Sequence, residues 1–314
     1  MKRLIISLSI ILCTSYYTFA QITYSSSSNM AAQRPAKTLD VSAMQVIYQA
    51  SSLSDTLNPE RIAKDTMILQ IGQNRISKYF PDTRIRDSIL RARLERQMSA
   101  AMVQGGSVSI VSAGATPGGP AGSGNQSIIF KNWPAGSITV TDRVMMDIYS
   151  YTESSNEIQW HILPDTDTVL TYLCQKAITT FRGRNYEAWF APDIPINEGP
   201  WKFCGLPGLI LKVYDTRQHY VFECIGLEQT KAPIEYADMD YLKTNRRDLA
   251  RIQRRYYDDP MAAMDNIRSS TPVPAGGNVQ RVMRAVNADG TEMDMNEMRN
   301  RLRNRGYNPI ELDV

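Results

Sequence analysis

Two residues in the middle of the sequence have the chemistry of a thiol hydrolase. Cys204 stands beside Gly205 at a turn, and His219 follows a second turn at Asp215, so a hairpin could bring the imidazole back to the thiol. Such enzymes need a histidine base within about 3 Å of the cysteine nucleophile. One hypothesis is therefore a thiol-dependent hydrolase that uses Cys204 and His219. The alternative is that Cys204 is packed or bridged beside a strand.

Other catalytic and metal-binding patterns do not occur in the sequence. His161 and His219 are its only histidines, neither has a partner at the spacing of a metal site, and there is no Cys-x-x-Cys pair. We therefore expect no metal and no cofactor. Gly-x-Ser-x-Gly is missing as well, and the Gly-rich stretch 104–126 lacks the Gly-Lys-Ser/Thr ending of a phosphate-binding loop.

Charged residues gather around a turn in which Arg182 and Arg184 flank Gly183. The acidic residues of the turns that follow are Asp193, Glu198 and Asp215. We interpret the group as salt bridges at the rim of a sheet, each of which stabilises the fold little. An anion-binding corner is the alternative.

Aromatic side chains are concentrated between residues 160 and 222. Such a concentration either fills a core or lines an apolar pocket. One antiparallel sheet with one helix across it often leaves apolar surface for a ligand or partner. We therefore predict an apolar ligand, a lipid or a peptide, bound by a defined set of side chains. The predicted lining residues are Trp160, Tyr172, Trp189, Phe190, Trp201, Phe203 and Phe222.

Charge and the N-terminus indicate where the protein works. The 35 Lys and Arg nearly balance the 32 Asp and Glu, so the overall charge gives no reason to expect binding to nucleic acid or to a membrane surface, and we expect no nucleic-acid partner. Residues 1–20 read as a signal peptide, because Lys2 and Arg3 precede an apolar run too short to span a bilayer, and Ala20 ends a small-residue cleavage site. We expect export to the periplasm or the outer membrane, and no transmembrane span. A lipid anchor on Cys13 is the weaker alternative.

Three cysteines remain after such cleavage. They are Cys174, Cys204 and Cys224. An odd number in an exported protein allows one disulfide and one free thiol, and the sequence does not choose the pair. Three buried thiols are the alternative.

The remaining pattern predicts one α+β domain over 39–260, after a leader at 21–38 and before an extension at 261–314. Apolar alternation predicts two strands in 41–80 and consecutive strands over 127–228, while helical spacing predicts helices at 83–103, 238–257 and 293–303. The insert 104–126 reads as disordered. Successive strands with short turns favour an antiparallel meander. We expect a curved antiparallel sheet, like a half-open barrel, with one or two helices against its concave face.

An ordered series of short motifs resembles the GLPGLI family of exported proteins from Bacteroidota. The series consists of Cys174-Gln175-Lys176-Ala177, Phe181-Arg182-Gly183-Arg184, Ala188-Trp189-Phe190, Ile194-Pro195, Gly199-Pro200-Trp201-Lys202-Phe203 and Gly205-Leu206-Pro207-Gly208-Leu209-Ile210. The ending Asn308-Pro309-Ile310-Glu311-Leu312 is also similar to that family. The resemblance implies an exported, envelope-associated protein and supplies no catalytic residues.

Three functional hypotheses follow. The leading one is a non-enzymatic envelope protein that binds an apolar ligand or an envelope partner. The second is the hydrolase described above. The third is a structural accessory of an outer-membrane complex, in which the basic face of the helix predicted at 238–257 meets the partner.

Overall fold

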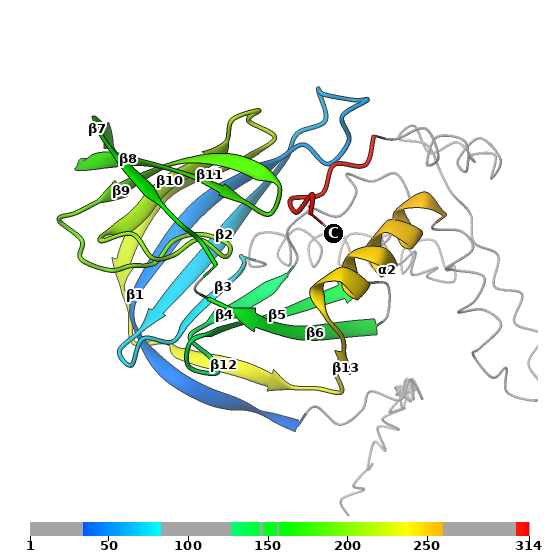
Figure 1. Ribbon diagram of the computed structural model, residues 1–314. Helices are drawn as coiled ribbons and strands as arrows, with labels where there is room; N and C mark the ends of the chain where they lie inside the picture. The colour runs from blue at the N-terminus through cyan, green and yellow to red at the C-terminus, as the bar shows by residue number, and fades with distance from the viewer. Residues whose placement is uncertain (1–33, 83–126, 145–146, 156, 260–305, 314) are drawn as a thin grey trace, which may run out of the picture. The chain divides into compact units, whose positions relative to one another are not determined.

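The computed structural model of the protein describes residues 34–82, 127–144, 147–155, 157–259 and 306–313 (Figure 1). Its large compact unit runs from Pro35 to Val314. Several predicted segments lie outside the described residues: the signal peptide 1–20, the helices at 83–103 and 293–303, and the insert 104–126.

In the described part of the chain, thirteen strands form a single sheet. The first six are β1 (Arg34–Ser52), β2 (Ala63–Gly72), β3 (Ser77–Pro81), β4 (Ile128–Lys131), β5 (Ser137–Val144) and β6 (Asp147–Ser154). The others are β7 (His161–Val169), β8 (Tyr172–Phe181), β9 (Arg184–Ala191), β10 (Leu209–Asp215), β11 (Tyr220–Gln229), β12 (Pro233–Asp238) and β13 (Leu242–Lys243). β1 thus begins within the segment predicted as a leader.

The sheet consists of two antiparallel meanders. The strand order is β13-β6-β5-β4-β3-β2-β1-β11-β10-β9-β8-β7, and β12 also pairs with β1. β1 joins the meanders, because it pairs with β2 on one side and with β11 on the other. Only the short β13 extends this path in parallel, against β6. Short turns join most neighbouring strands of the meanders, but long connections link β3 to β4 and β9 to β10, and the β1–β11 pairing connects residues far apart in sequence.

The sheet is strongly curved and does not close, which confirms the predicted α+β class with an open, curved antiparallel sheet (Figure 1). Register shifts between Ile47 and Tyr48, and between Ile210 and Lys212, help to bend it. Along each strand, alternate side chains face inward. On β9, for example, Arg184, Tyr186, Ala188 and Phe190 are buried.

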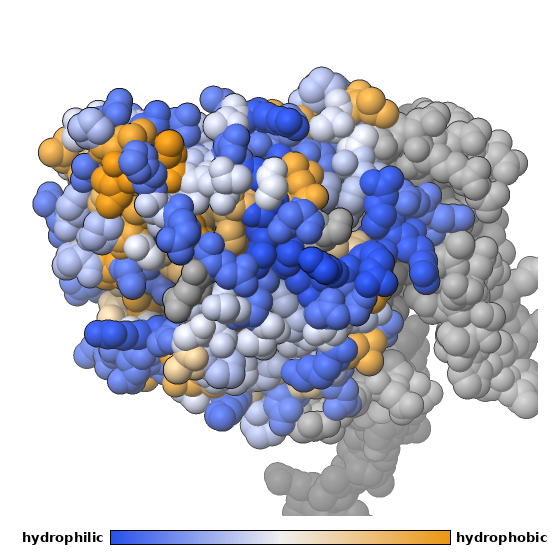
Figure 2. Space-filling model, in the orientation of Figure 1, coloured by the Kyte–Doolittle hydropathy of each residue, from blue (hydrophilic) through white to orange (hydrophobic). Residues whose placement is uncertain are grey.

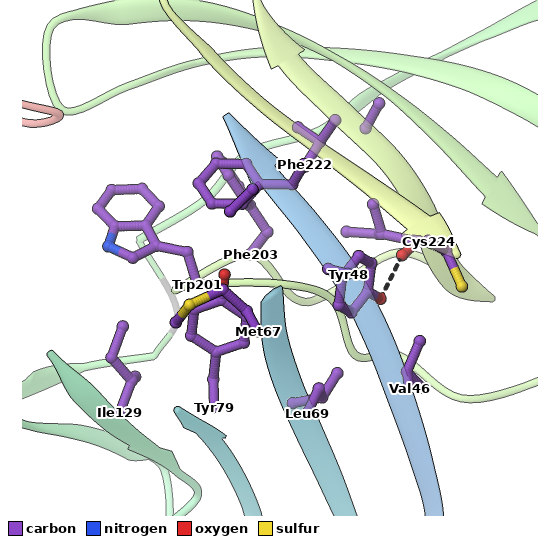
Figure 3. Packing of buried hydrophobic residues seen from close by; sticks show 14 of the residues in the cluster. Val46, Tyr48, Met67, Leu69, Tyr79, Ile129, Trp201, Phe203, Phe222 and Cys224 are labelled. Atoms are coloured by element: carbon purple, nitrogen blue, oxygen red, sulfur yellow. Dashed lines mark hydrogen bonds between the residues drawn. The ribbon is translucent and has the colours of Figure 1, made fainter. Parts of the chain in front are cut away.

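The interior is packed with aliphatic and aromatic side chains from both meanders (Figure 3). Val46 and Tyr48 of β1 lie among them, next to Leu69 of β2, and all three are fully buried. The Tyr48 hydroxyl donates a hydrogen bond of 2.6 Å to the carbonyl of Ile210, so its one polar atom is satisfied. The core therefore unites the two meanders across the β1–β11 seam.

Helix α2 (Arg246–Asp258) is the one helix in the described part of the chain, and it packs on β5 and β6 through Leu249. The prediction that this helix starts at residue 238 was wrong, because β12 ends at Asp238 and β13 occupies Leu242–Lys243 before the helix begins. The side chain of Asn245 then caps the helix by accepting a hydrogen bond of 3.0 Å from the Asp248 amide. Over the described residues, no helix is long and apolar enough to cross a bilayer.

Candidate functional site

The C-terminal residues 306–313, here called the tail, lie between the sheet and helix α2 and contact both (Figure 1, red). We call the body residues that contact the tail the tail groove. They are Leu53, Ser54, Asp55, Thr56, Arg182, Gly183, Arg184, Lys202, His219, Tyr220, Arg246, Arg254 and Tyr257. Many of them come from the motif-rich segment that the sequence analysis singled out.

The tail enters the groove as an extended segment paired with the loop after β1. Asp55 and Tyr307 form an isolated antiparallel bridge, and the Thr56 amide donates to the Gly306 carbonyl at 3.1 Å. The centroid of the Tyr307 ring lies 4.6 Å from that of the Tyr257 ring and 4.6 Å from the guanidinium carbon of Arg254. Backbone pairing and ring contacts thus fix the register of the tail.

Asn308 is the most completely bound residue of the tail. Its amide nitrogen Nδ2 donates to the Leu53 carbonyl and lies 3.2 Å from Nδ1 of His219. Its backbone carbonyl accepts a hydrogen bond from the Tyr220 hydroxyl, and its Oδ1 accepts one of 2.6 Å from Arg184. A side chain without these donors and acceptors would leave buried polar groups of the body unpaired.

Arg184 forms hydrogen bonds with three consecutive residues of the tail. Its guanidinium donates to Oδ1 of Asn308, to the Pro309 carbonyl and to the Ile310 carbonyl at 3.0 Å. Its remaining terminal nitrogen forms a 3.0 Å salt bridge with Asp215, and both side chains are only 2% exposed. The fork of a guanidinium suits such simultaneous contacts, which a lysine cannot reproduce. The predicted rim salt bridge is therefore a buried pair that holds the tail.

Gly183 allows the tail to approach closely. Its φ is +77°, a left-handed conformation that favours glycine, and a Cβ there would lie 2.9 Å from Cβ of Leu312. The Leu312 amide donates a 2.8 Å hydrogen bond to the carbonyl of Arg182 next to it. The Arg-Gly-Arg turn therefore binds the tail with its backbone as well as its side chains.

Lys202 holds the first acidic residue of the tail from inside the body. Its ammonium lies against Glu311 of the tail, and at 2.6 Å and 2.9 Å from Glu153 and the Tyr151 hydroxyl. Burial by itself lowers the pKa of Lys202, but Tyr151, Glu311 and Glu153 more than offset it and raise that pKa. The ammonium is only 1% exposed and stays charged. Its charge is matched by the carboxylates around it.

Arg246, at the start of α2, holds the second acidic residue. Its guanidinium donates to both carboxylate oxygens of Asp313, at 2.6 Å and 3.2 Å, and to Glu311 at 3.1 Å. Burial lowers the pKa of Arg246, and the hydrogen bonds that it donates to Asp313 and Glu311 raise that pKa by more than burial lowers it. The two-pronged contact is specific for a carboxylate.

A surface pocket of about 380 Å³ opens beside these charges. It is lined by Tyr151, Thr152, Glu153, Glu157, Arg182, Asn245, Arg246 and Arg247. Arg182 binds Glu153 and Glu157 at 2.8 Å and 2.7 Å. Among the described residues, ion pairs within the body join three cations, Arg182, Lys202 and Arg246, to these two carboxylates. The tail supplies the acidic groups that complete the pairing.

Cys204 and His219 have different partners. The Cys204 thiol is partly buried, and its Sγ lies 3.9 Å from the Ser155 carbonyl. Burial raises the pKa of this thiol, which is opposite to the shift that activates a nucleophile. His219 lies against Asn308 of the tail instead. The thiol-hydrolase hypothesis therefore gains no support from the placement of its two residues.

The seven predicted ligand-binding aromatics are partly core and partly surface. Phe190, Trp201, Phe203 and Phe222 are buried, whereas Trp160, Tyr172 and Trp189 are half-buried. Rings of the buried group face one another: Phe203 lies 5.1 Å from Trp201 and 6.2 Å from Phe222, centroid to centroid (Figure 3). Ligand binding by this set stays a prediction.

The cysteines and the other acidic residues complete the survey of predicted sites. Cys174, Cys204 and Cys224 are free thiols in the structure. Among the described residues, no group of three or more His, Cys, Asp or Glu is placed to hold a metal. Glu198 belongs to a different ion pair, at 2.6 Å from the buried Lys131. Asp193 is exposed.

Sequence reasoning missed Lys202, Arg246 and the tail as parts of one site. The alternation Trp201-Lys202-Phe203, a charged residue between two aromatics, was a usable signal, although the structure places it in a turn in which the Phe203 amide donates a 3.0 Å hydrogen bond to the Pro200 carbonyl. Trp201 and Phe203 enter the core, and Lys202 faces the tail.

Three comparisons with known proteins bear on this site. A family model described as a protein of unknown function (Porph_ging) matches residues 176–212. No curated protein matches the chain. Two solved structures of PNGF-II, in the C2 and P21 space groups, are similar at 12% identity, with TM-scores of 0.43 and 0.40. Each match covers 67% of this chain and 32% or 33% of the other, so the chain spans about a third of those proteins. Over the segment that supplies Arg182, Arg184 and Lys202, the chain is therefore similar to a family whose function is unknown.

Proposed function

We propose that the chain is an exported, non-enzymatic binding protein of the cell envelope and that its recognition site is the tail groove. In this proposal the groove binds an extended segment of a partner protein that carries closely spaced carboxylates. The observation that carries the proposal is the docked tail itself, in which Glu311 and Asp313 meet the buried Lys202 and the partly buried Arg246. The chain's own sequence thus serves as an example of the ligand.

The chemistry of the groove favours a peptide over a small apolar molecule. The Arg184 guanidinium donates to two backbone carbonyls and one side-chain amide oxygen of the tail. The backbone carbonyl of Arg182 accepts a hydrogen bond from a backbone amide of the tail. Backbone contacts give affinity for any extended chain, while side-chain pockets give specificity, as in other modes of peptide recognition. The two tail carboxylates then add charge-assisted contacts.

Export belongs to the same proposal. It is supported by the basic and apolar pattern of residues 1–20 and by the resemblance to the GLPGLI family. The family match at 176–212 covers the residues that build the groove from β8 to β10. Recognition of an envelope partner by this segment would give its motifs a role in binding as well as in folding.

A labelled peptide with the sequence of residues 306–313 tests the proposal directly. The receptor is the full chain with Glu311→Gln and Asp313→Asn, which weakens its own tail and leaves the groove residues unchanged. We expect saturable binding in fluorescence anisotropy. A matched peptide with Gln and Asn at the two acidic positions should bind about tenfold or more weakly, because a hydrogen bond to a charged group contributes ~1.5–3 kcal/mol.

A second receptor guards against failure of that variant to fold. The wild-type chain is mixed with excess peptide, and displacement of its tail is followed as faster hydrogen exchange at the Leu312 amide. In the docked state this amide donates a hydrogen bond to the Arg182 carbonyl, which slows its exchange. If neither receptor distinguishes the acidic peptide from its neutral match, the groove is not a recognition site and the proposal is wrong.

A further inference from the structure

We infer that a second pocket, at the turn between β7 and β8, binds the alkyl chain of an aliphatic amine. The pocket forms where this turn meets β10 and β11, and its volume of about 380 Å³ lies in the range of small-ligand sites. Its apolar lining residues are Val169, Leu170, Cys224 and Ile225. None of them belongs to the tail groove, so this site is separate from the one proposed above.

The apolar surface around the pocket is unusually exposed. Leu170, Leu173 and Ile225 are 48%, 59% and 51% exposed. Leu173 pairs with Thr168, which also lines the pocket, so the two side chains lie on the same face of the sheet. Figure 2 shows an apolar patch over this end of the sheet. Apolar side chains that are exposed together, and not singly, mark a binding surface.

The backbone of Leu170 is strained without a benefit to the fold. Leu170 has a φ of +55° and is the first residue of the two-residue turn between Val169 and Tyr172. Glycine and asparagine adopt this left-handed conformation readily, whereas a bulky leucine does so rarely. Its side chain is half exposed, so burial within the chain recovers little of the cost. A ligand that covers Leu170 would account for both the strain and the exposure.

The charges at the pocket favour a cationic ligand over an anionic one. Lys212 lies 3.4 Å from Glu223, so these two charges offset each other. Asp167 also lines the pocket, and it forms no ion pair with any residue that the structure describes. One negative charge therefore remains uncompensated at the rim. An ammonium group beside Asp167 would balance it, whereas a carboxylate or a phosphate would be repelled.

The extent of the apolar surface favours an alkyl chain over the side chain of a lysine. Leu170 and Ile225 line the pocket and are also half exposed, so the apolar surface continues beyond the pocket itself. The short stem of a lysine covers only part of this surface. A longer chain covers more of it, and each additional buried methylene strengthens binding by about fourfold. The expected ligand is thus a single aliphatic chain that ends in an ammonium group.

Titration of the full chain with simple amphiphiles tests this site. The chain carries ¹³C-labelled methyl groups on isoleucine and leucine, and the ligands are octylammonium, hexylammonium, octanol and octanoate, each below its micelle-forming concentration. We expect saturable shifts of the Ile225 and Leu170 methyl resonances. Ile162, on the same strand as part of the lining but outside the pocket and 42% exposed, should not shift. Octylammonium should bind several-fold more tightly than hexylammonium or octanol, and octanoate should bind most weakly.

Two variants separate the charge from the apolar surface. Asp167→Asn should weaken octylammonium several-fold and leave octanol unchanged, whereas Asp165→Asn, an exposed position on the same strand outside the lining, should change neither. Leu170→Asn should weaken both ligands, and asparagine suits the left-handed turn, so the variant should fold. Its control is Leu57→Asn, at a position that is 66% exposed and lies outside the pocket.

The inference is wrong if the Ile225 methyl resonances do not shift up to the solubility limit of octylammonium. Equal shifts of Ile162 and Ile225 would show unspecific partitioning and would also overturn it. Octanoate that binds as tightly as octylammonium contradicts the role of Asp167. N-acetyl-lysine amide that binds as tightly as octylammonium contradicts the role of the alkyl chain and makes a lysine of a partner protein the ligand. None of these results bears on the tail groove, which the peptide experiment tests independently.

Discussion

The aromatic core and the tail groove are built from the same stretch of sequence but hold together in different ways. Trp201 and Phe203 enter the core, where Phe203 meets several other rings, while Lys202 between them faces the tail. Each ring contact in the core is one of many and can be replaced by another apolar side chain. Each charge in the groove has a few partners, and losing one leaves another buried charge unpaired.

This comparison indicates which substitutions the fold tolerates without a large loss of stability. An apolar core responds to substitution in proportion to the volume lost. A buried ion network responds to which partner is removed. The surface is also divided into polar and apolar regions. Figure 2 shows mostly hydrophilic residues over α2 and an apolar patch over the end of the sheet that holds β7 and β8. Leu170 and Leu173 at that end are exposed, at 48% and 59%.

The largest effect is expected for Lys202→Met, which keeps the size of the side chain and removes its charge. Glu153 and Glu311 then lose a cation that lies within ion-pair distance of both. We expect the free energy of unfolding to fall by ~3–5 kcal/mol, measured by urea denaturation with tryptophan fluorescence. The control Lys212→Met removes an exposed pair with Glu223 and should change stability by less than about 1 kcal/mol. Equal effects of the two substitutions contradict the account.

Arg184→Lys should have the next largest effect. A lysine keeps the charge opposite Asp215 but cannot reach Asn308, Pro309 and Ile310 together. We expect a loss of ~2–3 kcal/mol, since several hydrogen bonds to a charged group disappear.

The same variant should release the tail before the rest of the chain unfolds. A protease that cuts within the tail should act on Arg184→Lys at urea concentrations that leave the wild-type tail intact. Identical cleavage of the two proteins shows that Arg184 does not hold the tail.

Phe203→Leu tests the apolar side of the comparison. Phe203 is fully buried and contacts rings of Phe181, Tyr186, Trp201 and Phe222. Leucine keeps most of the apolar volume, so we expect a loss of only about 1.5 kcal/mol in urea denaturation, well below that of Lys202→Met. A greater loss than for Lys202→Met reverses the comparison.

The pH dependence of the Lys202 contribution should be flat through neutrality. The folded state raises the pKa of Lys202, because its carboxylate partners more than offset the effect of burial. A group of this kind stabilises the fold fully below its unfolded pKa of about 10.4, and the stabilisation is lost as pH rises through the folded value. The difference in stability between wild type and Lys202→Met should therefore stay constant from pH 7 to about 10 and shrink above that range. A difference that shrinks between pH 7 and 9 contradicts this assignment.

The smallest effect concerns the thiols. Burial raises the pKa of Cys204, and burial also raises the pKa of Cys224 to about 11. Both thiols should therefore react slowly with a disulfide reagent near neutral pH in the folded protein. Cys204, the less buried of the two, should be modified first. Rapid modification of Cys204 at neutral pH would revive the thiol-hydrolase hypothesis.

Local patterns in the sequence predicted the strands between 127 and 228 but not the way in which they assemble, and they missed one of the three strands in 34–81 as well as β12 and β13. Apolar alternation is visible within a few residues, and it located the strands from 127 to 228. The pairing of β1 with β11 connects Val46 with Leu227, and no short pattern reports a contact over that distance. The start of helix α2 was misplaced because Leu242 and Lys243 fit a helical stripe, although they form β13 against β6.

The groove was only partly predictable for the same reason. The charged turn around Gly183 and the tail motif were both visible, but neither segment indicates that it binds the other. Their contact depends on the curvature of the sheet and on the path of the chain, which are set by non-local packing. Lys202 was read as part of a motif, because its partners Glu153 and Glu311 lie far away in sequence.

Hydrogen exchange at the Leu312 amide is the most direct test of the claim that the body holds the tail. This amide donates to the Arg182 carbonyl at 2.8 Å in the docked state. We predict that it exchanges much more slowly in the intact wild-type chain than in a free peptide of residues 306–313 under the same conditions. Equal exchange rates in the chain and in the peptide would contradict the account.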